Sequence, residues 1–235
     1  MVGSSVSREA DEVFYTWAGP EIGVASTKAY LTQLIAMYTL GIYFAEVTGR
    51  ITPKDSDALK TEMLNLPEKV AEALKLNDEV KAYAELIYDK TDAYFLGRGM
   101  DYLVSLEASL KLKELTYIHS EGIQGGELKH GPIALIEAGT VVISTMTQES
   151  LVEKMVSNLK EVHSRGADIL AIVSANYAEM VRPQVDHIIV IPEVLDLLST
   201  VVSIIPLQLL AYQVCTLKGL DVDKPRNLAK SVTVE

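Results

Sequence analysis

The chain lacks several features that would place it in whole classes of proteins. Its 235 residues include one cysteine, Cys215, within an apolar run. No disulfide can form inside the chain, so we expect a buried thiol and a cytoplasmic location. A stretch of about 18 apolar residues without charge is missing, which argues against a membrane-spanning helix. The N-terminus has no basic segment followed by an apolar core, which argues against a signal peptide.

Basic residues and metal ligands are also scarce. The chain has 21 Lys and Arg against 32 Asp and Glu, a net charge of -11. Nucleic acids and anionic membranes need clustered basic side chains, so neither is an expected partner. A phosphorylated ligand would be held by helix N-termini and a few lysines. Cysteine and histidine are too few and too scattered for a metal site, and we expect no metal and no cofactor.

What the chain does have is the composition of a globular protein, with 49% hydrophobic and 23% charged residues. The apolar pattern of 29–47, which follows Ser26-Thr27-Lys28 and stops at Gly49, predicts a helix. Residues 2–11 are predicted to be a loop. Further helices are expected at 53–64, 67–76 and 78–89, the first two of them starting at prolines.

From residue 93 onward, short β-branched or apolar runs alternate with helical patterns. Strands are expected at 93–99, 140–145, 169–174 and 187–191, helices at 102–119, 149–165 and 193–218, and a glycine-rich loop at 122–131. This alternation predicts an α/β fold, a parallel sheet flanked by helices. We predict a complete domain at 91–217, preceded by the helical end of another domain at 1–50 and linking helices at 51–90, and followed by a tail at 218–235.

The helix predicted at 102–119 carries charged residues at helical spacing. Glu107, Lys111 and Glu114 share one face, and Glu121 would follow if the helix continued that far. One interpretation is a solvated face with an ordinary Glu–Lys pair. The other is a carboxylate that acts as a base, with a neighbouring ammonium group that controls its pKa and stabilises an enolate.

Two loops could also bind or react. His130 lies in the segment 125–132, which is rich in glycine and ends in Gly-Pro, and histidine suits proton transfer near neutral pH. A structural or simply exposed histidine is the alternative. The loop at 19–28 leads into a helix N-terminus, whose free amides suit an anion or a sugar hydroxyl. A plain helix cap is the alternative there.

The last segment, 223–235, reads DKPRNLAKSVTVE and has no apolar periodicity. Frayed tails are usually featureless and charged. This one combines specific polar residues with a lysine, Lys230, flanked by small residues. We interpret it as a segment that docks in a cleft and places Lys230 there.

These motifs together resemble the isomerase region of the glucosamine-6-phosphate synthase family, also called glutamine–fructose-6-phosphate aminotransferases (isomerizing). The segments that carry the resemblance are 3–9, 21–28 (EIGVASTK), 95–99 (FLGRG), 107–114 (EASLKLKE), 126–132 (GELKHGP), 206–212 (PLQLLAY) and the tail. The likeness covers essentially the whole chain. It implies the SIS fold, in which parallel sheets are flanked by helices, here with one complete SIS domain.

The resemblance also implies roles. Glu114 would move a proton between C1 and C2 of the sugar, Lys111 would stabilise the charge that develops, and Lys230 would engage the sugar carbonyl. His130 would assist ring opening from the neighbouring subunit, which implies a homodimer. The residues that would line the sugar are Val24, Ser26 and Ala229. The implied partners are fructose 6-phosphate and glucosamine 6-phosphate.

The sequence departs from the family at two places. It shows no glutaminase domain with an N-terminal cysteine, and no serine-rich phosphate loop; the nearest stretch, Ser5-Val6-Ser7, is followed by Arg8. We therefore expect the acid–base apparatus to be present but sugar phosphate to bind weakly and turn over little. A non-catalytic SIS module that binds sugar phosphate, or a dimerisation module, is the alternative, since a fold alone does not fix a function.

Overall fold

The computed structural model describes residues 2–231, so positions 232–235 of the predicted tail lie outside the described residues. Its centre is a five-stranded sheet in the order β2-β1-β3-β4-β5, with every neighbouring pair parallel. The strands are β1 (Asp92–Gly97), β2 (His119–Gln124), β3 (Val141–Met146), β4 (Asp168–Ser174) and β5 (His187–Ile191). The predicted α/β class, a parallel sheet flanked by helices, is confirmed.

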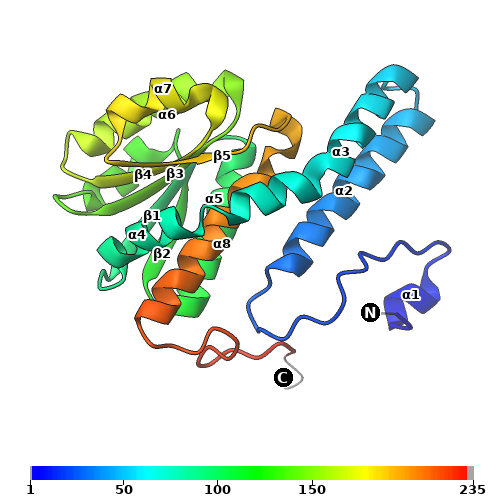
Figure 1. Cartoon of the computed structure of the whole chain (residues 1–235), viewed down its shortest axis with the longest axis horizontal. Coiled ribbons are helices and arrows are strands. Elements are labelled where there is room, and N and C mark those ends of the chain that lie inside the picture. Colours follow the sequence, from blue (N-terminus) through cyan, green and yellow to red (C-terminus); the bar gives the residue numbers. More distant parts are fainter. Residues whose placement is uncertain (1, 232–235) are drawn as a thin grey trace.

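Helices cover both faces of this sheet (Figure 1). On one face lie α4 (Asn77–Ile87), α5 (Met100–Thr116) and α8 (Ser199–Leu217), and on the other α6 (Glu149–His163) and α7 (Ala178–Val181). The inner strands bury nearly all their side chains, which is why their sequences are continuously apolar instead of alternating. Two separate apolar clusters result, one on each face.

Two long helices precede this α/β unit. Helix α2 (Lys28–Val47) packs on α8, where the Tyr38 hydroxyl lies 2.7 Å from the Thr200 hydroxyl. The prediction of two helices at 53–64 and 67–76 is wrong: α3 (Pro53–Leu74) is continuous through Pro67. Proline removes one backbone donor, but here the ring is on the exposed side while the neighbouring Leu66 is buried. Packing of Leu66 therefore holds the helix together.

The region after α5 also differs from the prediction. Helix α5 ends at Thr116 because Tyr117 adopts the left-handed conformation, with φ 62°. His119 then begins β2, and Glu121 lies on that strand instead of on the helix face. The strand was expected to be helix and loop because β2 is an edge strand with a polar sequence, HSEGIQ, which gives little strand signal.

Smaller corrections concern the two ends. Residues 5–9 form a short helix, α1 (Ser5–Glu9), where a loop was predicted; the Ser4 hydroxyl accepts from the Ser7 amide and caps it. Helix α8 begins at Ser199, after a 3₁₀ turn, instead of at residue 193. The sequence expectation that no stretch could span a membrane needs correction: among the described residues one helical stretch, Asp196–Leu217, has the required length and hydropathy, and 78% of its apolar 18-residue window is buried inside the fold.

Candidate functional site

A buried lysine between two carboxylates lies on the last turns of α5. The Lys111 ammonium is 2.7 Å from Glu114 Oε2 and 3.4 Å from Glu107 Oε1, and only 4% of its side chain is exposed. The carboxylates keep some access to solvent, with 16% of Glu107 and 22% of Glu114 exposed. The interpretation of this face as fully solvated is therefore wrong. Buried charge of this kind occurs in pairs, as it does here.

Burial also alters the acid–base properties around Lys111. It raises the pKa of Glu107, against the opposing effect of the Lys111 ammonium. Tyr30, in the first turn of α2, has its pKa raised to about 12 by burial and then by the Glu107 carboxylate.

The loop before α2 is organised around Glu21. Its Oε1 accepts hydrogen bonds from the backbone amides of Thr27 at 2.8 Å and Ala29 at 3.4 Å, so this side chain caps the N-terminus of α2. Burial alone would raise the pKa of Glu21, but these amides and the Lys230 ammonium together lower it to about 2. Glu21 is consequently ionised at any physiological pH.

The tail returns to this loop along the end of α5. The Arg226 amide donates to the Tyr117 hydroxyl at 2.7 Å, and the Arg226 guanidinium stacks 4.1 Å from the centre of the Tyr117 ring. Further upstream, the carbonyl of Asp223 accepts from the amide of Val24 at 3.0 Å. These contacts bring Lys230 to the loop, where its ammonium donates to Glu21 Oε2 at 2.9 Å and to the Gly23 carbonyl at 2.8 Å.

The structure places the site residues predicted from the sequence in two groups. Lys111 and Glu114 form one pair, while Lys230 and Val24 belong to the contact between tail and loop. Ser26 is half-buried in the same loop, and Ala229 is exposed beside Lys230. Tyr117 ends the helix that carries Lys111 and also holds the tail, so the two groups of residues flank the same end of α5.

His130 lies elsewhere. It ends a 3₁₀ turn, Leu128–His130, that follows the carboxyl end of β2, whereas Glu114 lies at the end of α5, which leads into the amino end of the same strand. Glu114 therefore lies near the amino ends of the strands, and His130 lies near their carboxyl ends. The His130 side chain is 71% exposed and its Nδ1 lies 2.8 Å from Glu127 Oε2. Within one chain His130 cannot act together with Glu114.

Ligands of parallel α/β sheets usually bind at the carboxyl edge, where the strand order reverses, here between β1 and β3. In this chain the protein's own side chains fill that place. Asp101 accepts from the Thr147 amide and hydroxyl at 2.8 and 2.5 Å, and Asp196 accepts from the Glu149 amide at 2.9 Å. Burial raises the pKa of Asp101 to about 6, although the Thr147 hydrogen bonds oppose the change. The amides that would bind an anion are already paired.

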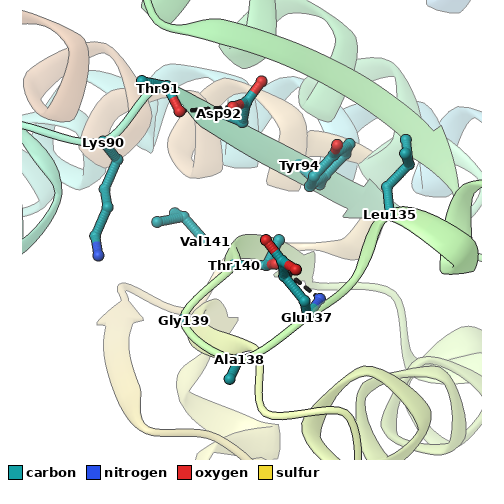
Figure 2. Close-up of a pocket in the computed structure, with 10 residues that line it drawn as sticks. All are labelled: Lys90, Thr91, Asp92, Tyr94, Leu135, Glu137, Ala138, Gly139, Thr140 and Val141. Atoms are coloured by element: carbon teal, nitrogen blue, oxygen red, sulfur yellow. Dashed lines mark hydrogen bonds between the residues drawn. The ribbon is translucent and has the colours of Figure 1, made fainter.

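A separate hollow of about 180 Å³ opens at the amino ends of β1 and β3. Figure 2 shows the residues that line it, which include Lys90, Asp92, Tyr94 and Glu137. None of the residues assigned to the site from the sequence is among them. Among the described residues, no group of three or more Cys, His, Asp or Glu side chains is placed to hold a metal ion.

The fold and this site define a class. A profile of the SIS domain matches residues 86–218, more than half of the chain, and the chain belongs to the SIS domain family. Among individual proteins, it is 59% identical over its whole length to a glutamine–fructose-6-phosphate aminotransferase [isomerizing] of Clostridium perfringens and 47% identical to that of Thermococcus kodakarensis. It spans 39% and 38% of these relatives, about two fifths of their length.

Solved structures give the same result. The C-terminal domain of glucosamine-fructose-6-phosphate aminotransferase from Francisella tularensis superposes with a TM-score of 0.92 at 40% identity, over 95% of this chain and 63% of that one. A glucosamine-6-phosphate deaminase from Thermotoga maritima reaches a TM-score of 0.71 at 26% identity, over 97% of this chain and 63% of the other. The resemblance stated from the motifs is confirmed: the chain is homologous to the isomerase region of these aminotransferases.

Sequence reasoning gave no role to some residues of this site. Glu107 was recognised as part of the helix face, but only the structure shows it against Lys111. Glu21 was recognised only as part of the motif at 21–28. Its position six residues before Thr27, whose amide it accepts from, could have indicated that it caps the helix. Tyr117 and Arg226 gave no signal, because their stacking depends on how the tail turns back over α5.

Proposed function

We propose that this chain carries the sugar-isomerising step of an aminotransferase that forms glucosamine 6-phosphate from fructose 6-phosphate and ammonia. The observation that supports the proposal is the link through Tyr117, which ends the helix of the Lys111–Glu114 pair and holds the tail that carries Lys230. The likeness to the aminotransferases supports it. In the overall reaction, ammonia replaces the C2 oxygen of the ketose, water leaves, and the carbonyl moves to C1.

Two proton positions change during isomerisation, and Glu114 is the proposed base that transfers a proton between C1 and C2. Lys111, 2.7 Å from Glu114, would lie close enough to stabilise the negative charge that develops on the enolic intermediate. Glu107 completes the group, with Oε1 3.4 Å from the Lys111 ammonium and a pKa that burial raises.

Lys230 would engage the carbonyl of the open-chain sugar. Its nitrogen would bond to the carbonyl carbon, the oxygen would leave as water, and an imine would form. Val24, Ser26 and Ala229 would line the sugar beside it. The tail is anchored by Tyr117 and by the Val24 amide, so it is held where such a contact is possible.

His130 enters this proposal only from a second copy of the chain. Its position at the opposite edge of the sheet from Glu114 is compatible with a homodimer in which each site borrows the partner's ring-opening histidine. We place such a dimer in the cytoplasm, in keeping with the single buried thiol.

Calorimetric titration with fructose 6-phosphate tests ligand binding. We expect weak, sugar-specific binding that falls further in Lys230→Ala and is retained in Lys224→Ala, which removes an exposed lysine from the same tail. Equal affinity for both variants would contradict the role of Lys230. Absence of binding at millimolar ligand would mean that this chain does not form the sugar site by itself.

Solvent deuterium exchange separates the enzyme from a simple binding module. Fructose 6-phosphate in heavy water should gain deuterium at carbon when mixed with the protein, and NMR would follow the exchange. Glu114→Gln should remove it, whereas Glu121→Gln should not, because Glu121 is exposed on β2. Binding without any exchange in the native protein would favour the non-catalytic SIS module.

A further inference from the structure

Glu21 divides its two carboxylate oxygens between different tasks. Oε1 accepts from the Thr27 and Ala29 amides and so belongs to the start of α2. Oε2 accepts from the Lys230 ammonium at 2.9 Å. Capping alone would use one oxygen, so the second oxygen is available for the tail.

The two partners differ in exposure. Only 11% of the Glu21 side chain is exposed, against 43% of the Lys230 side chain. A carboxylate fixed by backbone amides is a rigid acceptor, whereas a lysine on an exposed tail can leave. The Gly23 carbonyl, 2.8 Å from the same ammonium, adds a second fixed acceptor. The loop thus supplies two fixed hydrogen-bond acceptors, and the Lys230 ammonium is the group that donates to them.

We propose that Glu21 is a positioning residue. It holds Lys230 at the site until Lys230 leaves it to bond to the carbonyl carbon of a sugar. The proposal rests on the proposed function for the role of Lys230, but not for the contact itself. While the Lys230 nitrogen donates to Glu21 and to the Gly23 carbonyl, it is held in the loop and away from a carbonyl carbon, so its release from Glu21 is part of the reaction.

The contact can be measured without any sugar. Formaldehyde with cyanoborohydride methylates free amines, and peptide mass spectrometry gives the rate at Lys230. In Glu21→Gln the amide oxygen can still accept from Thr27, so α2 keeps its cap while the charge is lost. We expect Lys230 to be methylated roughly fivefold to tenfold faster than in the native protein, the size expected for losing one partly exposed charged hydrogen bond.

Controls distinguish the contact from a general change in charge. Asp223→Asn removes a carboxylate that lies next to Gly23 but is not paired with Lys230, and it should leave the rate at Lys230 unchanged. Lys224, in the same tail, should react equally in all proteins. Glu21→Asp keeps the charge on a shorter arm and should give an intermediate rate. Equal rates at Lys230 in native protein and both Glu21 variants would overturn the proposal, as would an equal rise in Asp223→Asn.

One further readout completes the test. Borohydride added with fructose 6-phosphate should trap the sugar on Lys230 as a secondary amine. Failure to trap it, with the methylation difference intact, would reject the proposed function of Lys230 and leave its contact with Glu21 established.

Discussion

At the scale of single residues, Lys111 is the most constrained charge in the site. Its ammonium is nearly inaccessible and lies between Glu107 and Glu114. Removing one member of a buried ion pair leaves the other charge without compensation. The cost of such a change exceeds the net benefit of the pair.

Lys111→Met should therefore lower the free energy of unfolding by about 3 kcal/mol, the lower end for buried pairs because both carboxylates keep some solvent. Lys113→Met, an exposed neighbour on the same helix, should change it by less than about 0.5 kcal/mol. Urea denaturation followed by circular dichroism measures both. Similar small changes in the two variants would show that the Lys111 charge contributes little to stability.

Asp101 makes stability depend on pH in the opposite direction from an aspartate whose pKa is lowered on folding. Its pKa is raised from 3.8 to about 6, so between these values the folded protein binds more protons than the unfolded one. The contribution of Asp101 is most favourable below pH 4 and is lost as pH rises to 6, by about 3 kcal/mol for two units of pKa.

Asp101→Asn should remove that slope. Relative to the variant, the native protein should lose stability steadily between pH 4 and pH 6 and then change no further. Denaturant titrations at several pH values would show it, with Asp57→Asn, an exposed position, as the control. If the stability difference between the native protein and Asp101→Asn did not vary with pH, the raised pKa of Asp101 could not be the cause.

Some of these residue properties could be predicted and others could not. The spacing of Glu107, Lys111 and Glu114 placed them on one helix face, which the structure confirms. Spacing does not say which face is buried, since that depends on α2, which comes far earlier in the chain. The pairing of Lys230 with Glu21 joins residues 209 positions apart, and only tertiary structure supplies it.

At the scale of elements, the tail is held by few contacts. Arg226 stacks on Tyr117, and its amide donates to the Tyr117 hydroxyl. Arg226→Ala removes the stacking and Tyr117→Phe removes the acceptor. Each should release the tail by about 1 kcal/mol, equivalent to roughly fivefold faster amide hydrogen exchange over residues 223–231.

Exchange measured by mass spectrometry checks this, with peptides from β3 and β4 as an internal reference that should not change. Arg182→Ala, on the far side of the sheet, is the matched control for loss of an exposed arginine. If Arg226→Ala and Arg182→Ala left the tail equally protected, other contacts would have to hold it.

Pro67 destabilises α3 locally. The missing amide leaves one carbonyl of the preceding turn without its helical partner. Pro67→Ala should raise the free energy of unfolding by about 1–3 kcal/mol. Pro53→Ala, at the first position of the same helix where proline is favourable, should not stabilise. Thermal unfolding measures both, and an unchanged midpoint for Pro67→Ala would contradict the assigned destabilisation by Pro67.

Element prediction failed where tertiary structure overrides local preference. Proline at 67 predicted a break, and burial of Leu66 and Ala73 maintains one helix instead. The sequence of β2 is polar because an edge strand has one neighbour, so it resembles loop more than strand. The inner strands were predicted because runs of β-branched residues favour a strand over a helix or a loop.

At the scale of the whole molecule, the two apolar clusters on the faces of the sheet should unfold as one unit, with the segment before α2 much less protected. Helix α1 buries no residue. Hydrogen exchange should therefore be fast across residues 2–20 and limited by global unfolding in β3 and β4. Protection of 2–20 comparable to that of the sheet would show that this segment is held by an interaction outside the described contacts.

The α/β architecture was the most predictable property, because the alternation of strand and helix patterns recurs along 130 residues and averages over local errors. The relation between the two edges of the sheet was not predictable. Whether His130 lies near Glu114 depends on residues 119–124 forming a strand, which separates the two residues, and that polar strand was not recognised from the sequence.

Helix α8 also has a consequence for synthesis of the protein. It contributes much of the cluster that covers one face of the sheet, and it follows all five strands in the chain. During translation every strand therefore emerges before α8, with only α4 and α5 available to cover that face. The part of the sheet that α8 covers stays exposed until residue 217 has left the ribosome, and that interval is when a chaperone would have most to protect.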